Sequence, residues 1–280
     1  MSETKLVSGS RWLLCHSVAV FAFLYLPIAI LILYSFNRDG VGGFPPRHLT
    51  LDWYRVLFAD EAIWDSVLNS LKVAFAAVAI SLMLGVPAAL ALERAQFPGK
   101  AVFRRLVLLP LILPGIITGL SLAMFFKVMG TNTSLLTIIL GHGTALISVA
   151  TTEVFAGLQK LDRAQEEASL DLGANYWQTF WRITVPNLKL PIIGAALLIF
   201  TLSMDEIAVS FFLIGRDNIL PLEIWGRLRR GITPEINAVS TIIFVFSLVA
   251  IVFWYRLRVR GERGTDAGAE IVQAMEGSGV

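Results

Sequence analysis

The sequence predicts an all-α integral membrane protein with six transmembrane helices. Of its 280 residues, 56% are hydrophobic and 16% are charged, whereas about 25% of the residues of an average soluble domain are charged. The mean hydropathy is +0.70. A helix needs about 20 mostly apolar residues to cross the hydrocarbon layer. Six stretches meet or approach that length: 12–36, 67–92, 102–126, 135–158, 190–214 and 236–257.

The first stretch is predicted to be a retained membrane anchor. It is long for the core of a signal peptide, and no small-residue cleavage site follows it. An even number of spans places both termini on one side of the membrane. If that side is the cytoplasm, most of the 23 Lys and Arg residues lie inside, as the positive-inside rule requires. We therefore expect a cytoplasmic N-terminus (1–11), a six-span domain (12–257) and a disordered cytoplasmic tail (258–280).

Prolines and small residues mark the interior of the spans. Pro110 and Pro114 each remove a backbone donor from the third span, which bends a helix; alternatively, they reflect the greater frequency of proline in membrane helices. Gly115, Gly119 and Ser121 form an edge of small residues that lets another helix approach closely. His142 in the fourth span is predicted to be a hydrogen-bonded packing residue rather than a proton relay.

Several classes of function are excluded by composition. The formal net charge is +2, and no nucleic-acid-reading motif is present. The single cysteine, Cys15, cannot form an intrachain disulfide, and no Cys/His cluster has the spacing of a metal site. The chain also lacks the Gly-x-x-x-x-Gly-Lys-Ser/Thr sequence that binds nucleotide phosphates. We therefore expect a non-enzymatic protein, embedded in lipid, with no cofactor of its own and no nucleic-acid partner.

The polar segment 159–189 has the signals of two short helices joined by a tight turn. Asp162 is positioned to cap the first helix, and Gln165 three residues later completes a capping box. Gly173 stands where a left-handed residue would end that helix. A second set of signals, a capping pair and a limiting proline, comes from Asn175, Gln178 and Pro186.

The two faces of this segment differ in character. Its apolar side chains are predicted to pack back on the ends of the spans: Ala168, Leu172, Tyr176, Phe180 and Ile183. Its polar side chains are left for a partner: Glu166, Glu167, Ser169 and Asp171. The segment could instead lie on lipid headgroups, but such helices are usually basic and the first helix here is acidic. A protein partner is therefore favoured.

A spaced set of residues runs through the segment: Glu167-Ala168-Ser169, three residues, Gly173, nine residues, Ile183, one residue, and Val185-Pro186. It resembles the EAA loop of the permease subunits of bacterial ABC importers, in which the pattern is Glu-Ala-Ala, three residues, Gly, nine residues, Ile, one residue and Leu-Pro. The spacing is intact, and Ser169 and Val185 are mild departures from the usual Ala and Leu.

This resemblance implies a type I ABC importer permease fold in a bacterial inner membrane. It implies that 159–189 is a coupling loop that seats on a separate ATPase dimer, which binds ATP and Mg²⁺. It also implies a second, related permease subunit and an extracytoplasmic substrate-binding protein. The residues implied in coupling are Glu166, Glu167, Ala168, Ser169, Asp171, Gly173, Ile183 and Pro186.

Polar residues gather in the fifth span: Thr201, Ser203, Asp205 and Glu206. In an unbroken helix, Ser203, Glu206 and Ser210 would share one face. A central Asp costs about 2.5–3.5 kcal/mol on insertion scales, and such residues usually mark a pathway. In one interpretation the two carboxylates line a path for cations. In the other, one of them caps a broken helix or pairs with Lys72 or Lys127.

Three short sequences resemble the spermidine/putrescine cluster of these permeases: 200–206, 220–222 and 233–238. The resemblance implies a polyamine or a related small cation as the substrate, with a different small solute as the alternative. A secondary transporter driven by an ion gradient is the rival class; it would need its own coupling-ion site and usually shows repeats. Near the last span, Trp225 and the arginines 227, 229 and 230 are either interfacial anchors or a contact for the binding protein.

Overall fold

The computed structural model describes residues 3–39, 45–46, 48–231 and 234–249. The secondary structure in these residues is helical, apart from an isolated bridge between Asn37 and Leu49. The chain divides into two compact units. The first comprises residues 1–60 with 227–280, and the second comprises residues 61–226.

The first unit contains a long helix, α1 (Glu3–Tyr34), and a short one, α2 (Asp52–Ala59), with a further apolar helix over Pro234–Val249. The apolar side chains of α1 are exposed, as expected for a helix surrounded by lipid or by other chains. The Ser35 and Tyr54 hydroxyls lie 2.7 Å apart, and the Trp53 indole N–H donates to the carbonyl oxygen of Asn37 at 2.8 Å. These bonds fasten the end of α1 to α2.

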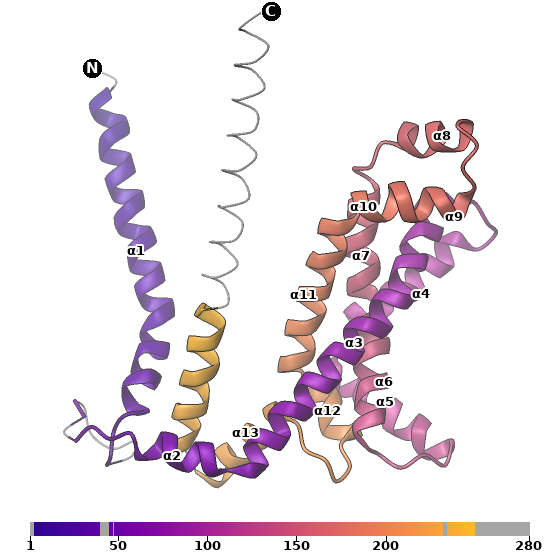
Figure 1. Ribbon diagram of the computed structural model, residues 1–280. Coiled ribbons are helices and arrows are strands. Elements are labelled where there is room, and N and C mark those ends of the chain that lie inside the picture. Colours follow the sequence, from indigo (N-terminus) through magenta and orange to yellow (C-terminus); the bar gives the residue numbers. More distant parts are fainter. Residues whose placement is uncertain (1–2, 40–44, 47, 232–233, 250–280) are drawn as a thin grey trace, which may run out of the picture. The chain divides into compact units, whose positions relative to one another are not determined.

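The second unit is built around one unbroken helix, α3 (Glu61–Arg94). It packs against α6 (Leu135–Ala145), α7 (Ile147–Leu158) and α11 (Lys189–Asp205). Figure 1 shows α3 running from one end of this unit to the opposite end, where α8 and α9 lie. The remaining helices of the unit are α4 (Lys100–Ile112), α5 (Gly115–Val128), α8 (Arg163–Asp171), α9 (Tyr176–Thr179), the π-helical turn η1 (Phe180–Thr184), α10 (Val185–Asn187) and α12 (Ala208–Leu213). Helix α13 (Leu220–Arg230) crosses the boundary between the units.

Small residues bring the helices of this bundle together. A Cβ atom on Gly85 would stand 2.4 Å from the Cβ of Ala150, and one on Gly143 would stand 2.8 Å from Ile80. The Ser81 hydroxyl donates to the carbonyl oxygen of Gly143 at 2.8 Å. Close backbone approach of this kind is how membrane helices gain contact without a hydrophobic driving force between them. The core of the unit therefore lies along α3.

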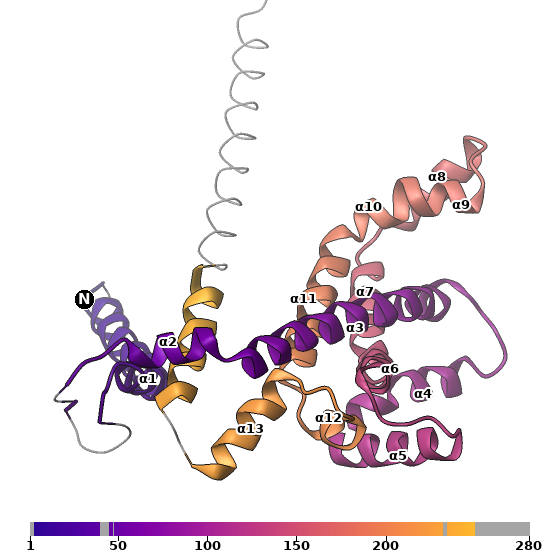
Figure 2. The same ribbon diagram turned by 60° about the horizontal axis from the view of Figure 1, so that its bottom comes forward.

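The third predicted span is a sharply bent helix pair. Helices α4 and α5 meet at 107°. Leu113, between them, is extended (φ −74°, ψ 133°), because a following proline disfavours helical backbone in the residue before it. Pro114 is thus the cause of the bend. The predicted small-residue edge is confirmed at its glycines, since a Cβ on Gly119 would stand 2.9 Å from the Cα of Val209. Ser121, the third predicted member, is exposed and is not part of this close approach. Figure 2 shows α5 beside α12.

The fifth predicted span, 190–214, is not one helix. Helix α11 ends at Asp205, Glu206 is extended (φ −78°, ψ 103°), and α12 begins at Ala208. The expectation that Ser203, Glu206 and Ser210 share one helical face is therefore wrong. Before α11 the chain turns by 68° from the 176–187 segment.

Among the described residues, three helices are long and apolar enough to cross a membrane: 12–34, 61–94 and 135–158. The number rises to five if each bent pair crosses as one span. The sixth predicted stretch, 236–257, begins as the helix Pro234–Val249, and its residues from 250 onward lie outside the described part of the chain, as does the predicted tail 258–280.

Candidate functional site

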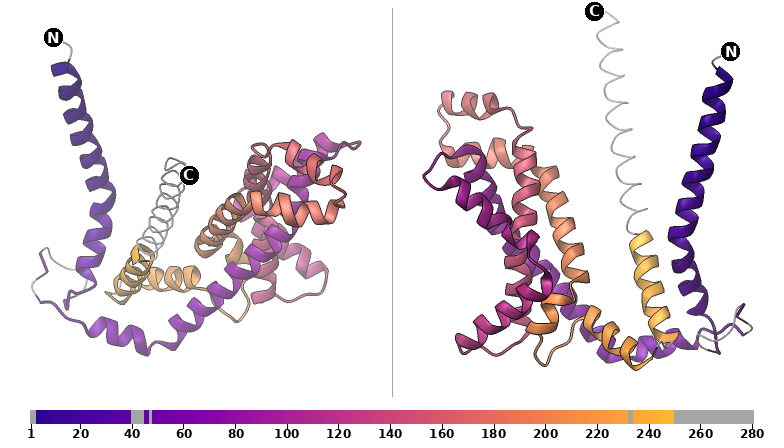
Figure 3. Two further views of the ribbon diagram at one scale, coloured as in Figure 1. Left: turned by 45° about the horizontal axis from the view of Figure 1, so that its top comes forward. Right: turned by 180° about the vertical axis from the view of Figure 1, so that it is seen from behind.

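The 159–189 segment forms a helix, a turn and a second helical run that stand beyond the ends of α3, α7 and α11, as Figures 1 and 3 show. We refer to it as the 159–189 loop. Asp162 Oδ1 accepts from the Ala164 N–H at 3.0 Å and caps α8. Asn175 and Gln178 form a reciprocal capping box at the start of α9, at 2.8 and 3.0 Å. The predicted box between Asp162 and Gln165 is absent, because Gln165 Oε1 accepts from Asn187 instead, at 3.1 Å.

Gly173 ends α8 in the predicted left-handed conformation, with φ +88°. Its N–H donates to the carbonyl oxygen of Leu170 at 2.9 Å, and the Ala174 N–H donates to that of Ser169 at 3.1 Å. These two bonds are a complete Schellman motif. The motif reverses the chain so that α9 returns alongside α8.

Two polar residues of α8 that were predicted to face a partner point inward instead. The Glu166 carboxylate lies 3.0 Å from the Arg94 guanidinium and accepts from the Thr184 hydroxyl at 2.7 Å. The Ser169 and Thr179 hydroxyls lie 3.1 Å apart. Positions 166, 169 and 170 share one helical face, and that face is turned toward the end of α3 and the second helical run.

The opposite face of the loop is exposed and partly apolar. Leu172 is 89% exposed and Tyr176 is 82% exposed, and Ala168 is exposed as well. The prediction that these three residues pack back on the span ends is therefore wrong. The reason is geometric, since Leu172 is two residues beyond Leu170 and therefore on the other side of α8. Phe180 and Ile183 are partly buried, as predicted. The exposed surface combines acidic, apolar and aromatic residues: Glu167, Ala168, Asp171, Leu172, Tyr176, Trp177 and Trp181.

A cavity of about 570 Å³ lies under the loop, between α7, α8, α10 and α11. Its polar lining comes from Glu153, Lys160, Asp162, Gln165 and Asn187. The loop is therefore joined to α3 by ion pairs, and on its α7 side it borders this cavity and packs through Leu161 against the buried cluster that includes Leu158 and Leu188.

The four polar residues predicted in the fifth stretch fall into two groups. Two are exposed, and two form hydrogen bonds within the chain. Asp205 and Thr201 are exposed, one helical turn apart on one face of α11. Glu206 caps α12, since its Oε1 accepts from the Val209 N–H at 2.9 Å. Neither carboxylate pairs with Lys72 or Lys127 within the described chain, so the cap of a broken helix is the interpretation that the structure supports for Glu206.

Ser203 belongs to a buried hydrogen-bond network centred on His142. Nδ1 of His142 lies 2.8 Å from Ser203 Oγ, and Nε2 lies 2.8 Å from Ser210 Oγ. The Ser210 hydroxyl donates to the carbonyl oxygen of Glu206 at 2.7 Å. Because a hydroxyl has one proton to donate, Nε2 of His142 must be the donor to Ser210. His142, 1% exposed, is thus the predicted packing residue, and it joins both sides of the break to α6.

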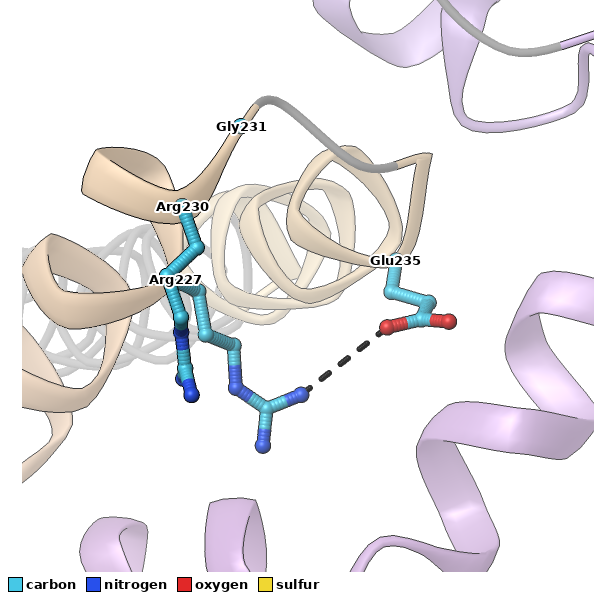
Figure 4. Close-up of a pocket in the computed structure, with 4 residues that line it drawn as sticks. All are labelled: Arg227, Arg230, Gly231 and Glu235. Carbon is cyan, nitrogen blue, oxygen red and sulfur yellow. Dashed lines mark ion pairs between the residues drawn. The ribbon is translucent and has the colours of Figure 1, made fainter.

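A second, smaller pocket of about 210 Å³ lies in the first unit. Figure 4 shows its lining, Arg227, Arg230, Gly231 and Glu235. Arg227 pairs with Asp60 at 2.7 Å and lies 3.9 Å from Glu235. Across the described residues no group of three or more His, Cys, Asp or Glu side chains could hold a metal ion.

Comparison with known proteins decides the family. The model of the binding-protein-dependent transport system inner membrane component family matches residues 81–262. The chain belongs to this family. The match includes the whole 159–189 loop and the helix breaks at 113–114 and 206–207, and the family assignment suggested by the spacing from Glu167 to Pro186 is confirmed.

Curated relatives in this family cover nearly the whole chain. The putrescine transport system permease protein PotI of Escherichia coli (strain K12) is 34% identical over 270 residues, which are 92% of this chain and 94% of PotI. The spermidine/putrescine transport system permease protein PotC of Haemophilus influenzae is 34% identical over 234 residues, 83% of this chain and 91% of PotC.

Solved structures show the same fold. A chain of a bacterial ABC transporter that imports alginate has a TM-score of 0.69 at 20% identity and covers 92% of this chain and 97% of that one. A chain of the MetNI methionine ABC transporter has a TM-score of 0.57 at 17% identity, with 73% and 95% covered. The predicted fold class, the type I ABC importer permease fold, is confirmed.

Sequence reasoning missed the residues that attach the loop, above all Arg94 and Thr184. Their partner Glu166 is far away in sequence from Arg94, and no local pattern joins them. The only signal was the pair Glu93-Arg94 at the end of an apolar stretch, where charged residues are ordinarily taken as markers of the membrane boundary.

Proposed function

We propose that the chain is the membrane-spanning permease subunit of an ATP-driven importer of small polyamines such as putrescine and spermidine. The observation that carries the proposal is 34% identity to a putrescine permease protein along 92% of the chain. The chain forms half of a translocation pathway in a bacterial inner membrane, with both termini and the 159–189 loop in the cytoplasm. The other half is a second, related permease subunit.

The 159–189 loop is the proposed seat of the ATPase. Its exposed side chains combine negative charge with aromatic surface that a partner can bury, as protein interfaces do. They include Glu167, Asp171, Tyr176 and Trp177. Ile183 and Pro186 support this surface from the second helical run. The partner ATPase dimer binds ATP and Mg²⁺ and performs the hydrolysis, so this subunit is not itself an enzyme.

Asp205 is the proposed contact for the cation inside the pathway. Its carboxylate is exposed at the last residue of α11, where the helix macrodipole adds partial negative charge. Thr201 lies one turn earlier on the same face. Ser203 and Glu206 serve the site indirectly, because their polar atoms hold the break that places Asp205 at a helix end. The Asp205 carboxylate would balance the charge of a polyamine ammonium group in an otherwise apolar span.

The arginine-lined pocket of the first unit is a proposed contact for the extracytoplasmic binding protein. Arg230 is exposed beside the ion pair of Arg227 and Glu235. Mixed charges at an interface rim fix the register of the partner and raise its rate of association.

The class of transporter is tested with the whole assembly. The complex purified through a tag on this chain, reconstituted in liposomes with the binding protein and radiolabelled putrescine, is expected to accumulate putrescine only when ATP reaches the cytoplasmic side. Accumulation driven by an ion gradient without ATP would contradict the proposal and favour a secondary carrier. A complex that hydrolyses ATP in response to a different solute would overturn the polyamine substrate and retain the permease.

Asp205→Asn is expected to lower putrescine uptake by roughly tenfold to a hundredfold, because hydrogen bonds to a charged group contribute about 1.5–3 kcal/mol. Glu206→Gln is the matched control. It removes the same charge but keeps the Oε1 acceptor that caps α12, so a smaller loss is expected. Initial rates of uptake at equal amounts of membrane-inserted protein are the measurement. Equal losses in the two variants would show that charge alone matters, and normal uptake in Asp205→Asn would remove this residue from the pathway.

A further inference from the structure

The Glu166 carboxylate is bound at both of its oxygens by different elements. Oε2 lies 3.0 Å from Nη2 of Arg94, the last residue of α3, and Oε1 accepts from the Thr184 hydroxyl of η1 at 2.7 Å. The Glu166 and Arg94 side chains are only 18% and 20% exposed. The Arg94 nitrogens Nε and Nη2 make no directional hydrogen bond in the described structure, so the attraction between this pair is that of close, poorly hydrated opposite charges. Removing one partner from such a pair is costly because the other is left uncompensated.

A second bridge runs parallel to the first. Nη2 of Arg163, the first residue of α8, donates to the carbonyl oxygen of Glu93 at 3.0 Å and lies 3.4 Å from its carboxylate. Helix α8 is therefore fastened to the last two residues of α3. On its other side the loop borders the cavity of about 570 Å³ next to α7, and Leu161 packs there against the buried cluster that includes Leu158 and Leu188.

Helix α3 extends from this attachment to the far end of the unit. It has 34 residues, which correspond to about 50 Å at 1.5 Å per residue. Near its other end, the Asn69 amide donates to the carbonyl oxygen of Asn218 at 3.1 Å, and the Ser70 hydroxyl accepts from the Leu220 N–H at 2.8 Å. One continuous helix is thus bonded to the loop at one end and to the segment that begins α13 at the other.

We infer that Arg94 and Glu166 form the mechanical link through which movement of the 159–189 loop reaches α3, and through α3 the opposite end of the bundle. Glu166 is accordingly a positioning residue of the permease and not a contact of the ATPase. This inference rests on the proposed coupling function. Helices α7 and α11 are joined to the loop directly by the chain. The inference adds α3, which is not adjacent to the loop in sequence, as a helix that transmits the loop's movement.

A charge exchange tests the link. Arg94→Glu and Glu166→Arg each place like charges together, so each single variant is expected to raise the number of ATP molecules hydrolysed per putrescine imported by roughly tenfold. The double variant restores opposite charges and is expected to return most of the way to the wild-type ratio. The matched control is the exposed pair Asp52 and Arg55, 3.8 Å apart with side chains 65% and 87% exposed. Reversal of either or both charges there is expected to change nothing, since exposed pairs contribute about 0–1 kcal/mol.

Hydrogen exchange of the α8 amides in the purified complex gives a readout that does not depend on the substrate. Faster exchange in both single variants and protection regained in the double variant support the link even if the imported solute is not a polyamine. A double variant as uncoupled as the singles, or single variants that couple normally, would overturn it. Loss of ATPase binding in the double variant would also overturn it, because Glu166 would then contact the ATPase itself.

Discussion

Gly173→Pro is expected to abolish the coupling of ATP hydrolysis to transport while the chain still inserts in the membrane. Proline fixes φ near about −65° and has no N–H, whereas Gly173 has φ +88° and donates to the carbonyl oxygen of Leu170. The variant cannot form the Schellman turn between α8 and α9. The exposed surface made by both helical runs would be lost, although the spans on either side are unchanged. The measurement is binding-protein-stimulated ATP hydrolysis and putrescine uptake by the purified assembly.

Two milder substitutions at the same position separate backbone strain from bulk. A Cβ on Gly173 would meet no atom within 4 Å, so any loss comes from the conformation alone. Alanine in a left-handed conformation costs about 1–2 kcal/mol, and asparagine tolerates it better. We expect coupling to decrease in the order Gly, Asn, Ala, Pro. Normal coupling in the proline variant, with the ATPase bound, would show that the loop does not deliver the movement.

Features that depend on neighbouring residues were predicted correctly from the sequence. The caps by Asp162 and Asn175 and the left-handed Gly173 each involve atoms within a few residues of one another, so the local pattern contains the whole cause. The bend in the third span is similar, because Pro114 acts directly on Leu113. The sequence alone did not decide whether this span bends, because proline also occurs in membrane helices without a large change of direction.

The orientation of α8 could not be predicted in this way. Hydrophobicity alone assigns Leu172 to the inside and Glu166 to the outside, and the structure reverses both. The decisive partner of Glu166 is Arg94, which the fold brings to the loop from the end of another helix. The pair turns this face of α8 toward the end of α3, and only the tertiary arrangement reveals that the pair exists.

The break after Asp205 had a local signal that was compatible with two structures. No proline or glycine lies between Thr201 and Ser210, so the apolar pattern predicts an unbroken helix. The alternative was a broken helix capped by Asp205 or Glu206, and in the structure Glu206 accepts from the Val209 N–H. What stabilises the break is His142, whose ring bonds to serines on both sides, and such a network is not visible in a single stretch of sequence.

Gly85→Leu is expected to prevent the second unit from folding. A Cβ at this position would stand 2.4 Å from the Cβ of Ala150 and 3.1 Å from the backbone nitrogen of Thr151. A methyl fixed to the backbone and the backbone itself have no rotamer to change, so α3 and α7 would have to separate along their contact. Overpacking a core by single methylenes already costs about 1–3 kcal/mol. We expect little monodisperse protein after detergent extraction, compared with wild type at equal synthesis.

The same change at Gly194 is the matched control, because a Cβ there would meet no atom within 4 Å and leucine favours helix more than glycine does. Gly194→Leu is therefore expected to leave the yield of folded chain unchanged. Gly85→Ala should be destabilised less than Gly85→Leu and should be partly restored by Ala150→Gly, which removes the atom in conflict. Helix propensity alone predicts that alanine at 85 stabilises and glycine at 150 destabilises. Restoration by Ala150→Gly would therefore show that the lost stability comes from the close contact between α3 and α7. If Ala150→Gly instead worsened the Gly85→Ala variant, propensity and not close approach would govern the α3 and α7 contact.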